Sequence, residues 1–159
     1  MPGSAFNHLL DIVKRSGLPF ILHEHTSTRT MEDATQNLSF DVARIVKTVA
    51  FRIRSGGLLL AALRGTGRVD YPRLAALVGV NRRDLAPLSP EEVLELLGVE
   101  PGCVSPLLIL GDAAVLINDD VLTIQPTIYC GIGRPDRTLE IAAVDLVRLT
   151  SGRIGGFSR

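Results

Sequence analysis

A predicted β-hairpin between residues 45 and 64 places the strongest constraint on how this chain can fold. Segment 45–54 is rich in Val, Ile, Phe and Thr, which favour extended backbone. Gly56-Gly57 is typical of a turn, and Leu58–Arg64 supplies a returning apolar strand. Because both strands are so apolar, other elements must cover them. The hairpin therefore predicts a sheet at the centre of the molecule.

Helices are predicted around this hairpin, beginning at or just after Ser4, Thr30 (with Glu32 and Asp33), Asp70, Ser89 and Val144. The first has apolar residues at positions 6, 9, 10 and 13, the spacing of an amphipathic helix, and ends at Gly17. The third places Leu74, Leu77 and Val78 inward and ends at Gly79. Ser89-Pro90-Glu91-Glu92 is the clearest local signal, because it combines a capping box with a proline in the first turn.

Further strands are predicted at 19–25, 114–118, 121–125, 127–130 and 138–142. Helices and strands do not alternate as regular βαβ units, which favours an α+β fold over a doubly wound one. A chain of 159 residues fits one domain. We therefore expect a single domain over residues 1–159, with a strongly curled mixed β-sheet of about seven strands flanked by helices.

The charge balance limits the classes of binding partner. Lys and Arg number 17, as do Asp and Glu, and this zero formal net charge argues against a protein that coats nucleic acid non-specifically. Residues 1–80 hold ten basic against six acidic side chains, and residues 81–159 hold seven against eleven. This asymmetry is either scattered surface charge or a basic side that meets an anion, to which Arg52 and Arg54 would contribute.

The same composition indicates a soluble, cytoplasmic protein without a membrane partner. The longest apolar run has six residues, and the N-terminus lacks the features of a signal peptide. Two cysteines, Cys103 and Cys130, do not make a disulfide framework, so reduced thiols are expected.

Lys47 is the first candidate site residue. Positions 45, 49, 51 and 53, which share its face of the predicted strand, are all apolar. Burying an unpaired charge costs several kcal/mol, so the ammonium should reach a cleft, a carboxylate or an anionic ligand. The alternative is that the side chain extends to solvent from the end of the strand.

Two glycine-containing loops are further candidates. In 98–106, two prolines define a rigid loop in which Gly102 permits close backbone approach to a ligand, and free N–H groups could bind an oxyanion. The alternative is an ordinary connection. In 129–137, a strand runs into Gly131-Ile132-Gly133, which lacks the third glycine of a dinucleotide-binding motif.

Neither a metal nor a cofactor is predicted. His23 and His25 would share one face of a strand, but no matching ligand pair follows, so solvated or hydrogen-bonded histidines are favoured. No base adjacent to Cys130 is identifiable, which favours a buried thiol over a nucleophile.

Four motifs in this order resemble one family: Val46-Lys47-Thr48; Val69-Asp70 at the start of a helix; Gly102-Cys103-Val104-Ser105-Pro106, a GxxxP loop; and Thr127-Ile128-Tyr129-Cys130-Gly131-Ile132-Gly133 before Leu139-Glu140-Ile141. The family is that of the YbaK/EbsC-like aminoacyl-tRNA deacylases, which are similar to the editing domain of bacterial prolyl-tRNA synthetase. The resemblance runs from about residue 20 to residue 149.

The resemblance implies a hydrolase of translation fidelity that cleaves the ester of mischarged aminoacyl-tRNA. A water, oriented by backbone and by the substrate's 2′-hydroxyl, attacks without a metal, a cofactor or a protein nucleophile. The resemblance assigns Lys47 and Gly102 as catalytic. It assigns substrate binding to Thr48, Cys103, Ser105, Cys130, Gly131 and Glu140.

The implied partner is the 3′ acceptor end of tRNA, and an aminoacyl-tRNA synthetase is a further candidate. A small amino acid is implied, with Ala, Ser, Thr and Cys all open, because one methylene or hydroxyl changes binding by only about 1–3 kcal/mol. The alternative is a non-catalytic module of the same fold that binds tRNA or a synthetase.

Overall fold

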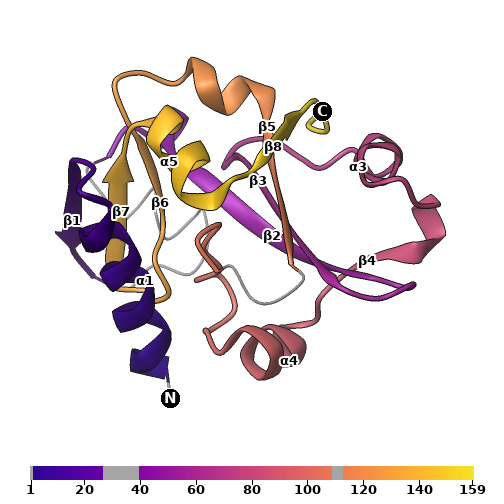
Figure 1. Ribbon diagram of the computed structural model, residues 1–159, viewed down its shortest axis with the longest axis horizontal. Coiled ribbons are helices and arrows are strands. Elements are labelled where there is room, and N and C mark those ends of the chain that lie inside the picture. The colour runs from indigo at the N-terminus through magenta and orange to yellow at the C-terminus, as the bar shows by residue number, and fades with distance from the viewer. Residues whose placement is uncertain (1, 27–39, 109–112) are drawn as a thin grey trace.

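The computed structural model describes residues 2–26, 40–108 and 113–159 (Figure 1). Within these ranges the strands are β1 (Phe20–Glu24), β2 (Val46–Ile53), β3 (Leu58–Arg64), β4 (Leu85–Pro87), β5 (Ala114–Asn118), β6 (Ile128–Gly131), β7 (Arg137–Ile141) and β8 (Arg153–Gly155). The α-helices are α1 (Pro2–Ser16), α3 (Tyr71–Val78), α4 (Pro90–Glu92) and α5 (Ala143–Thr150). Short helical turns are η1 (Val42–Arg44), η2 (Arg82–Asp84), η3 (Val93–Leu97) and η4 (Asp119–Thr123). None of the described helices is long and apolar enough to cross a membrane.

The described strands form two sheets, in the orders β4-β2-β3-β5-β8 and β1-β7-β6. The larger sheet is mixed, because β2 pairs antiparallel with β3 and β4 whereas β5 pairs parallel with β3 and β8. A single parallel bridge from Ile45 to Tyr129 joins β6 to the start of β2. The α+β class is thus confirmed. About seven strands in one sheet were expected, and the eight described strands form two ladders that meet at one bridge.

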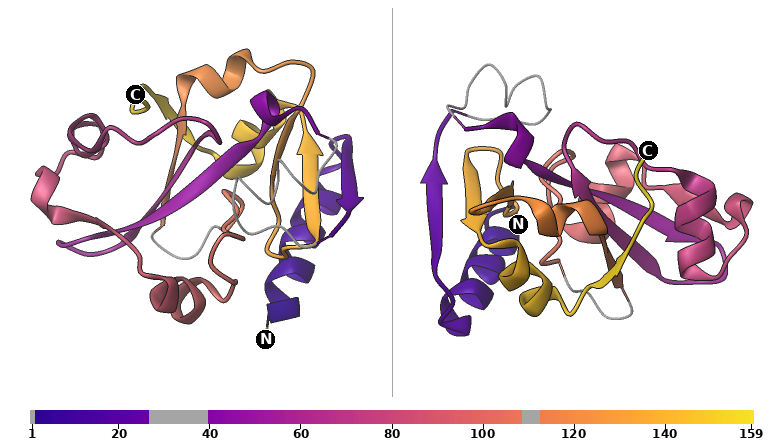
Figure 2. Two further views of the ribbon diagram at one scale, coloured as in Figure 1. Left: turned by 180° about the vertical axis from the view of Figure 1, so that it is seen from behind. Right: turned by 90° about the horizontal axis from the view of Figure 1, so that it is seen from above.

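Strand β3 separates two apolar clusters. Its residues 59–63 are all fully buried. Leu60 and Ala62 belong to the larger cluster, which α1 and α5 cover, and both helices lie on the same side of the strands in Figure 2. Leu59 and Leu63 belong to the smaller cluster with Leu74 of α3. Both faces of the central hairpin are therefore covered, as its composition predicted.

Most predicted helix signals are confirmed. The carboxylate of Asp70 accepts a hydrogen bond from the Arg73 N–H and caps α3, which ends at Gly79 in the left-handed conformation. At Ser89 both hydrogen bonds of the capping box are present. Ser4, predicted as an N-cap, lies inside α1 instead, because that helix begins at Pro2.

One predicted strand is wrong. Segment 121–125 was expected to be extended, but Asp119–Thr123 forms the 3-10 helix η4. Val121 and Ile124 are both buried in the larger cluster, and a helical turn brings two residues at this spacing to the same side. The three-residue strands β4 and β8 were not predicted. The short helix expected at Thr30, with Glu32 and Asp33, lies outside the described residues.

Candidate functional site

Three of the predicted site residues share one face of the strands. Side chains alternate along a strand, and paired residues point to the same side. The bridge between Ile45 and Tyr129 therefore places Lys47 on the same face as Gly131, two residues further along each strand. Tyr129 also pairs with Glu140 on β7, so Glu140 faces this side too.

Lys47 pairs across the hairpin with Leu63, a member of the smaller apolar cluster. Its Nζ donates a hydrogen bond to the Gly67 carbonyl oxygen at 2.6 Å, in the connection between β3 and α3. Partial burial, and secondarily the positive charge of Arg68, lower the pKa of Lys47 from its usual value. The sequence predicted a cleft, a carboxylate or an anionic ligand for this inward-facing ammonium, whereas the partner in the structure is a backbone carbonyl. An ammonium has three donors, and the described residues engage one of them.

The 102–106 loop contacts the third motif. Gly102 is exposed with φ of +88°, a conformation that favours glycine. The Val104 carbonyl oxygen lies 3.0 Å from the position that a Cβ would occupy on Gly131. Cys103 and Ser105 are buried, and the Ser105 hydroxyl accepts a hydrogen bond from the Leu107 N–H. Their side chains therefore hold the loop, and its exposed part is the backbone around Gly102.

Thr48 and Cys130 lie on the opposite face of their strands from Lys47. Cys130 is part of the larger apolar cluster, and burial raises the pKa of its thiol to about 12. The Thr48 hydroxyl is buried without a hydrogen-bond partner among the described residues. The fold thus brings Lys47, Gly131 and Glu140 to one face and turns these two side chains away from it.

Glu140 is held in a network of hydrogen bonds. One carboxylate oxygen lies 2.7 Å from His23 Nε2, and the other accepts from the Thr127 hydroxyl and from Arg44. The Thr127 hydrogen bond, followed by His23 and then Arg44, lowers the pKa of Glu140 against the opposing effect of burial. His25 Nε2 lies 2.7 Å from the Thr138 hydroxyl. Of the alternatives predicted for the two histidines, solvated or hydrogen-bonded, the structure shows hydrogen bonds at both.

Sequence reasoning missed Arg44 and Phe40. The Phe40 and Tyr129 rings stack with centroids 4.2 Å apart, and the Arg44 guanidinium lies 4.6 Å from the centre of the Tyr129 ring. Both residues precede β2 in a segment without strand periodicity, so no pattern marked them. With His23 and Glu140 they add aromatic, cationic and anionic groups to the face that carries Lys47.

Arg52 and Arg54, expected to form part of a basic footprint, have carboxylate partners. Arg52 forms an ion pair with Glu92, and Arg54 Nη1 lies 4.0 Å from an Asp84 oxygen. Both arginines lie toward the end of β2 that is remote from the bridge at Ile45. The cation that influences Lys47 is Arg68.

Comparison with known proteins identifies one family. Residues 25–149 match the family model of the aminoacyl-tRNA editing domain. The protein YwhH of Bacillus subtilis (strain 168), itself uncharacterized, is 26% identical over 129 residues, which are 81% of this chain and 80% of YwhH. A proline–tRNA ligase of Thermosipho melanesiensis (strain DSM 12029 / CIP 104789 / BI429) is 32% identical over 84 residues, or 52% of this chain and 14% of the ligase.

Solved structures show the same fold. The hypothetical protein APE2540 superimposes with a TM-score of 0.85 at 25% identity, covering 95% of this chain and 99% of that one. A protein proposed to be a trans-editing enzyme for prolyl-tRNA synthetase superimposes with a TM-score of 0.83 at 25% identity, covering 98% and 97%.

Proposed function

The chain belongs to the family of aminoacyl-tRNA editing domains, and on this premise we propose that it is a deacylase acting on tRNA that carries a wrongly attached small amino acid. The hydroxyl of a water molecule joins the carbonyl carbon of the amino acid, and the 3′ oxygen of the terminal adenosine leaves with the proton. The products are a free amino acid and an uncharged tRNA. Because charged tRNA is a cytoplasmic substrate, the proposal includes a cytoplasmic location. It also includes a single editing domain over residues 1–159.

The observation that carries the proposal is the family match over residues 25–149, a range that contains Lys47, the 102–106 loop and Glu140. In this proposal the Lys47 ammonium holds a phosphate near the 3′ end of the tRNA or orients the ester. Two of its donors have no hydrogen-bond partner among the described residues and are available for that task, and the charge of Arg68 adds to the local positive potential.

The 102–106 loop positions the aminoacyl group and stabilises the developing oxyanion through backbone N–H groups. Gly102 suits this role because it is exposed and leaves the backbone open to close approach. An aminoacyl ester is already activated, so positioning and oxyanion stabilisation can supply most of the acceleration. The attacking water is oriented by backbone and by the substrate's 2′-hydroxyl, and Gly131 and Glu140 contribute to the substrate-binding face.

The remaining assigned residues act less directly in this proposal. Cys103 and Ser105 fix the loop from within, while Thr48 and Cys130 pack beneath the face that carries Lys47. Discrimination among Ala, Ser, Thr and Cys depends on differences in binding free energy of about 1–3 kcal/mol in the pocket. The identity of the amino acid that is removed is therefore determined by measurement.

The test is a deacylation panel of Ala-, Ser-, Thr- and Cys-tRNA with several acceptor stems. Proline tRNA is included because one structural relative is a proposed trans-editing enzyme for prolyl-tRNA synthetase. Lys47→Ala is compared with Lys14→Ala, which removes an exposed lysine of α1. We expect amino-acid release by the unaltered chain and by Lys14→Ala, and a loss of about 100-fold or more in a folded Lys47→Ala.

Each other outcome has a definite meaning. Turnover by Lys47→Ala near that of the unaltered chain would overturn the role of Lys47. Binding of tRNA without release from any substrate would identify a non-catalytic module that binds tRNA or a synthetase. Hydrolysis of free model esters that competing tRNA does not affect would identify a different esterase.

A further inference from the structure

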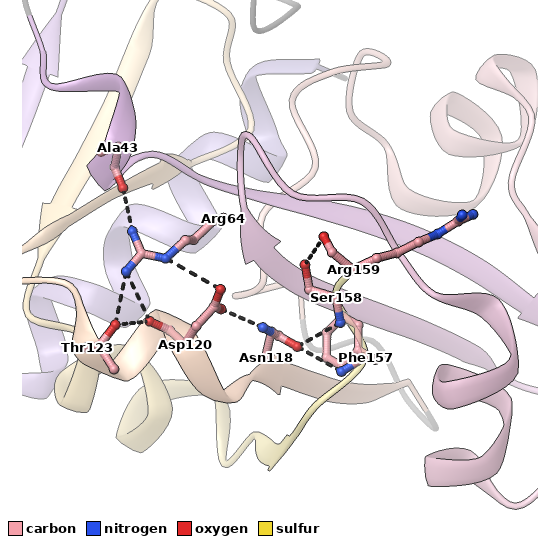
Figure 3. A network of polar contacts seen from close by, with 8 residues as sticks. All are labelled: Ala43, Arg64, Asn118, Asp120, Thr123, Phe157, Ser158 and Arg159. Atoms are coloured by element: carbon pink, nitrogen blue, oxygen red, sulfur yellow. Dashed lines mark hydrogen bonds and ion pairs between the residues drawn. The ribbon is translucent and has the colours of Figure 1, made fainter.

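We propose that the 157–159 segment positions Lys47 by holding the loop between β3 and α3, and that Asn118 is the positioning residue that anchors this segment (Figure 3). The catalytic consequence of this inference rests on the proposed function, because it assumes that deacylation uses Lys47. The structural coupling itself does not depend on that assumption.

The first link is the contact between Lys47 and the loop. The Lys47 Nζ donates to the carbonyl oxygen of Gly67, and the Gly67 N–H donates to the Arg64 carbonyl oxygen at 2.9 Å. The position of the Lys47 ammonium therefore depends on where the loop holds the Gly67 carbonyl oxygen.

The second link is the pairing of the loop with the 157–159 segment. The Asp70 N–H donates to the Phe157 carbonyl oxygen at 2.7 Å, and the Arg159 N–H donates to the Arg68 carbonyl oxygen at 2.8 Å. Val69 and Ser158 form an antiparallel bridge between these two hydrogen bonds. The Phe157 side chain is fully buried in the smaller apolar cluster, so the segment is fixed at one end.

The third link is Asn118, the last residue of β5, which is 3% exposed. Its Oδ1 accepts from the N–H groups of both Phe157 and Ser158, at 2.8 and 3.0 Å. Its amide nitrogen donates to Asp120, which pairs with Arg64 at the end of β3. One buried side chain thus ties the segment to the hairpin that carries Lys47, and Figure 3 shows this chain of contacts from Ala43 to Arg159.

The chain contains two lysines, Lys14 and Lys47, which makes the coupling directly observable. Lysine labelled with ¹³C at Cε gives one NMR signal from each, and exposed Lys14 serves as an internal reference. The Lys47 signal should titrate below the usual range for lysine in the unaltered chain, because burial and the charge of Arg68 lower the pKa of Lys47.

Arg159→Pro and Arg159→Ala form a matched pair. Both remove the same guanidinium, but only proline removes the N–H that donates to the Arg68 carbonyl oxygen. We expect Lys47 in Arg159→Ala to titrate as in the unaltered chain. In Arg159→Pro the freed loop lets the Lys47 ammonium reach water, so the pKa of Lys47 should rise toward the usual value for lysine. Identical Lys47 titrations in both folded variants would overturn the inference.

Asn118→Ala and Thr123→Ala extend the test along the same network. The Thr123 hydroxyl accepts a hydrogen bond from Arg64 and donates one to the Asp120 carbonyl oxygen, not to the segment, so its variant should leave the Lys47 signal unchanged. Asn118→Ala should shift the signal at least as far as Arg159→Pro, and an unshifted signal in the folded variant would overturn the role of Asn118. If Asn118→Ala does not fold, the comparison of Arg159→Pro with Arg159→Ala decides whether the segment positions Lys47.

The activity arm separates this inference from the proposed function. Deacylation kcat/KM should fall severalfold in Arg159→Pro relative to Arg159→Ala, and the difference should vanish in a Lys47→Ala background. A difference that persists there would show that the segment does not act through Lys47. Absence of deacylation by the unaltered chain would overturn the proposed function, while the NMR comparison would still decide the coupling.

Discussion

Gly131 and Val104 approach so closely that a Cβ on Gly131 would lie 3.0 Å from the Val104 carbonyl oxygen. Gly131 ends β6, and Val104 belongs to the loop that follows α4 and η3. A glycine is needed here because two backbone segments touch, and this contact fixes the 102–106 loop against the strand that carries the third motif.

Gly131→Ala should therefore disturb the loop. The added methyl meets a backbone oxygen that cannot rotate away, so the loop must shift, at an expected cost of about 1–3 kcal/mol in the free energy of unfolding. Deacylation kcat should fall because the loop backbone moves. Gly156→Ala is the control, since its Cβ would meet only the Asp119 side chain, at 3.2 Å. Denaturant unfolding and deacylation assays compare the two, and equal behaviour would refute the importance of the contact.

Glu140→Gln should lower stability at neutral pH and have little effect in acid. Hydrogen bonds from Thr127 and His23, together with Arg44, lower the pKa of Glu140 in the folded state. A carboxylate whose folded pKa is lowered contributes stability above its unfolded pKa of about 4.3, and loses it as pH falls through the folded pKa. The expected loss at pH 7 is about 1–2 kcal/mol, measured by denaturant unfolding across pH.

Glu24→Gln is the matched control for that experiment. Glu24 lies on neighbouring β1 with its side chain 73% exposed, 3.6 Å from Arg137. Exposed ion pairs contribute little, so its variant should unfold like the unaltered chain at every pH. A Glu140→Gln variant with the same pH profile as this control would contradict the stabilising role of the network.

Cys130 should be chemically inert in the folded protein. Burial raises the pKa of its thiol to about 12, and only the thiolate is a good nucleophile. Neither cysteine forms a disulfide and both are buried, so a thiol reagent at pH 8 should label neither residue before denaturation and both afterwards. Cys130→Ala should retain most of the deacylation kcat. Rapid labelling of Cys130 in the folded state would contradict this environment, and loss of kcat in a folded Cys130→Ala would favour the nucleophile over the buried thiol.

Ser89→Ala should destabilise the protein by about 1 kcal/mol, because it removes one half of the capping box. For a chain of this size that corresponds to a fall in Tm of about 2–4 °C. Ser55→Ala, in the exposed turn of the hairpin, is the control and should leave Tm unchanged. Scanning calorimetry measures both, and equal Tm values for the two variants would show that the cap contributes nothing.

Local features of this fold were predictable because their causes lie within a few residues. The caps at Asp70 and Ser89, the Gly56-Gly57 turn and the alternation in β2 each depend on neighbouring side chains. The division into two sheets was not predictable. It arises because the two sheets are joined only by the isolated bridge between Ile45 and Tyr129 among the described residues, and no local signal marks where strand pairing ends. Segment 121–125, predicted to be a strand, has strand-forming residues, but burial of Val121 and Ile124 together favours a helical turn.

In the candidate site, too, local features were predictable from the sequence and long-range contacts were not. Strand alternation predicted that Lys47 faces inward and needs a partner, yet Gly67 could not be identified because a long-range loop contact places it there. Arg44 reaches Glu140 across the same long range, from a segment without periodicity. The motifs indicated the family because they preserve order and spacing, and the contacts among them required the folded chain.

Strand β3 has a consequence for how the protein unfolds. Its consecutive buried residues point alternately into the two apolar clusters, so the two clusters pack against opposite faces of the same strand. Loss of either cluster exposes one side of that strand and removes the support of the other. Neither cluster can persist as a separate stable unit, and the described core should melt in a single cooperative transition.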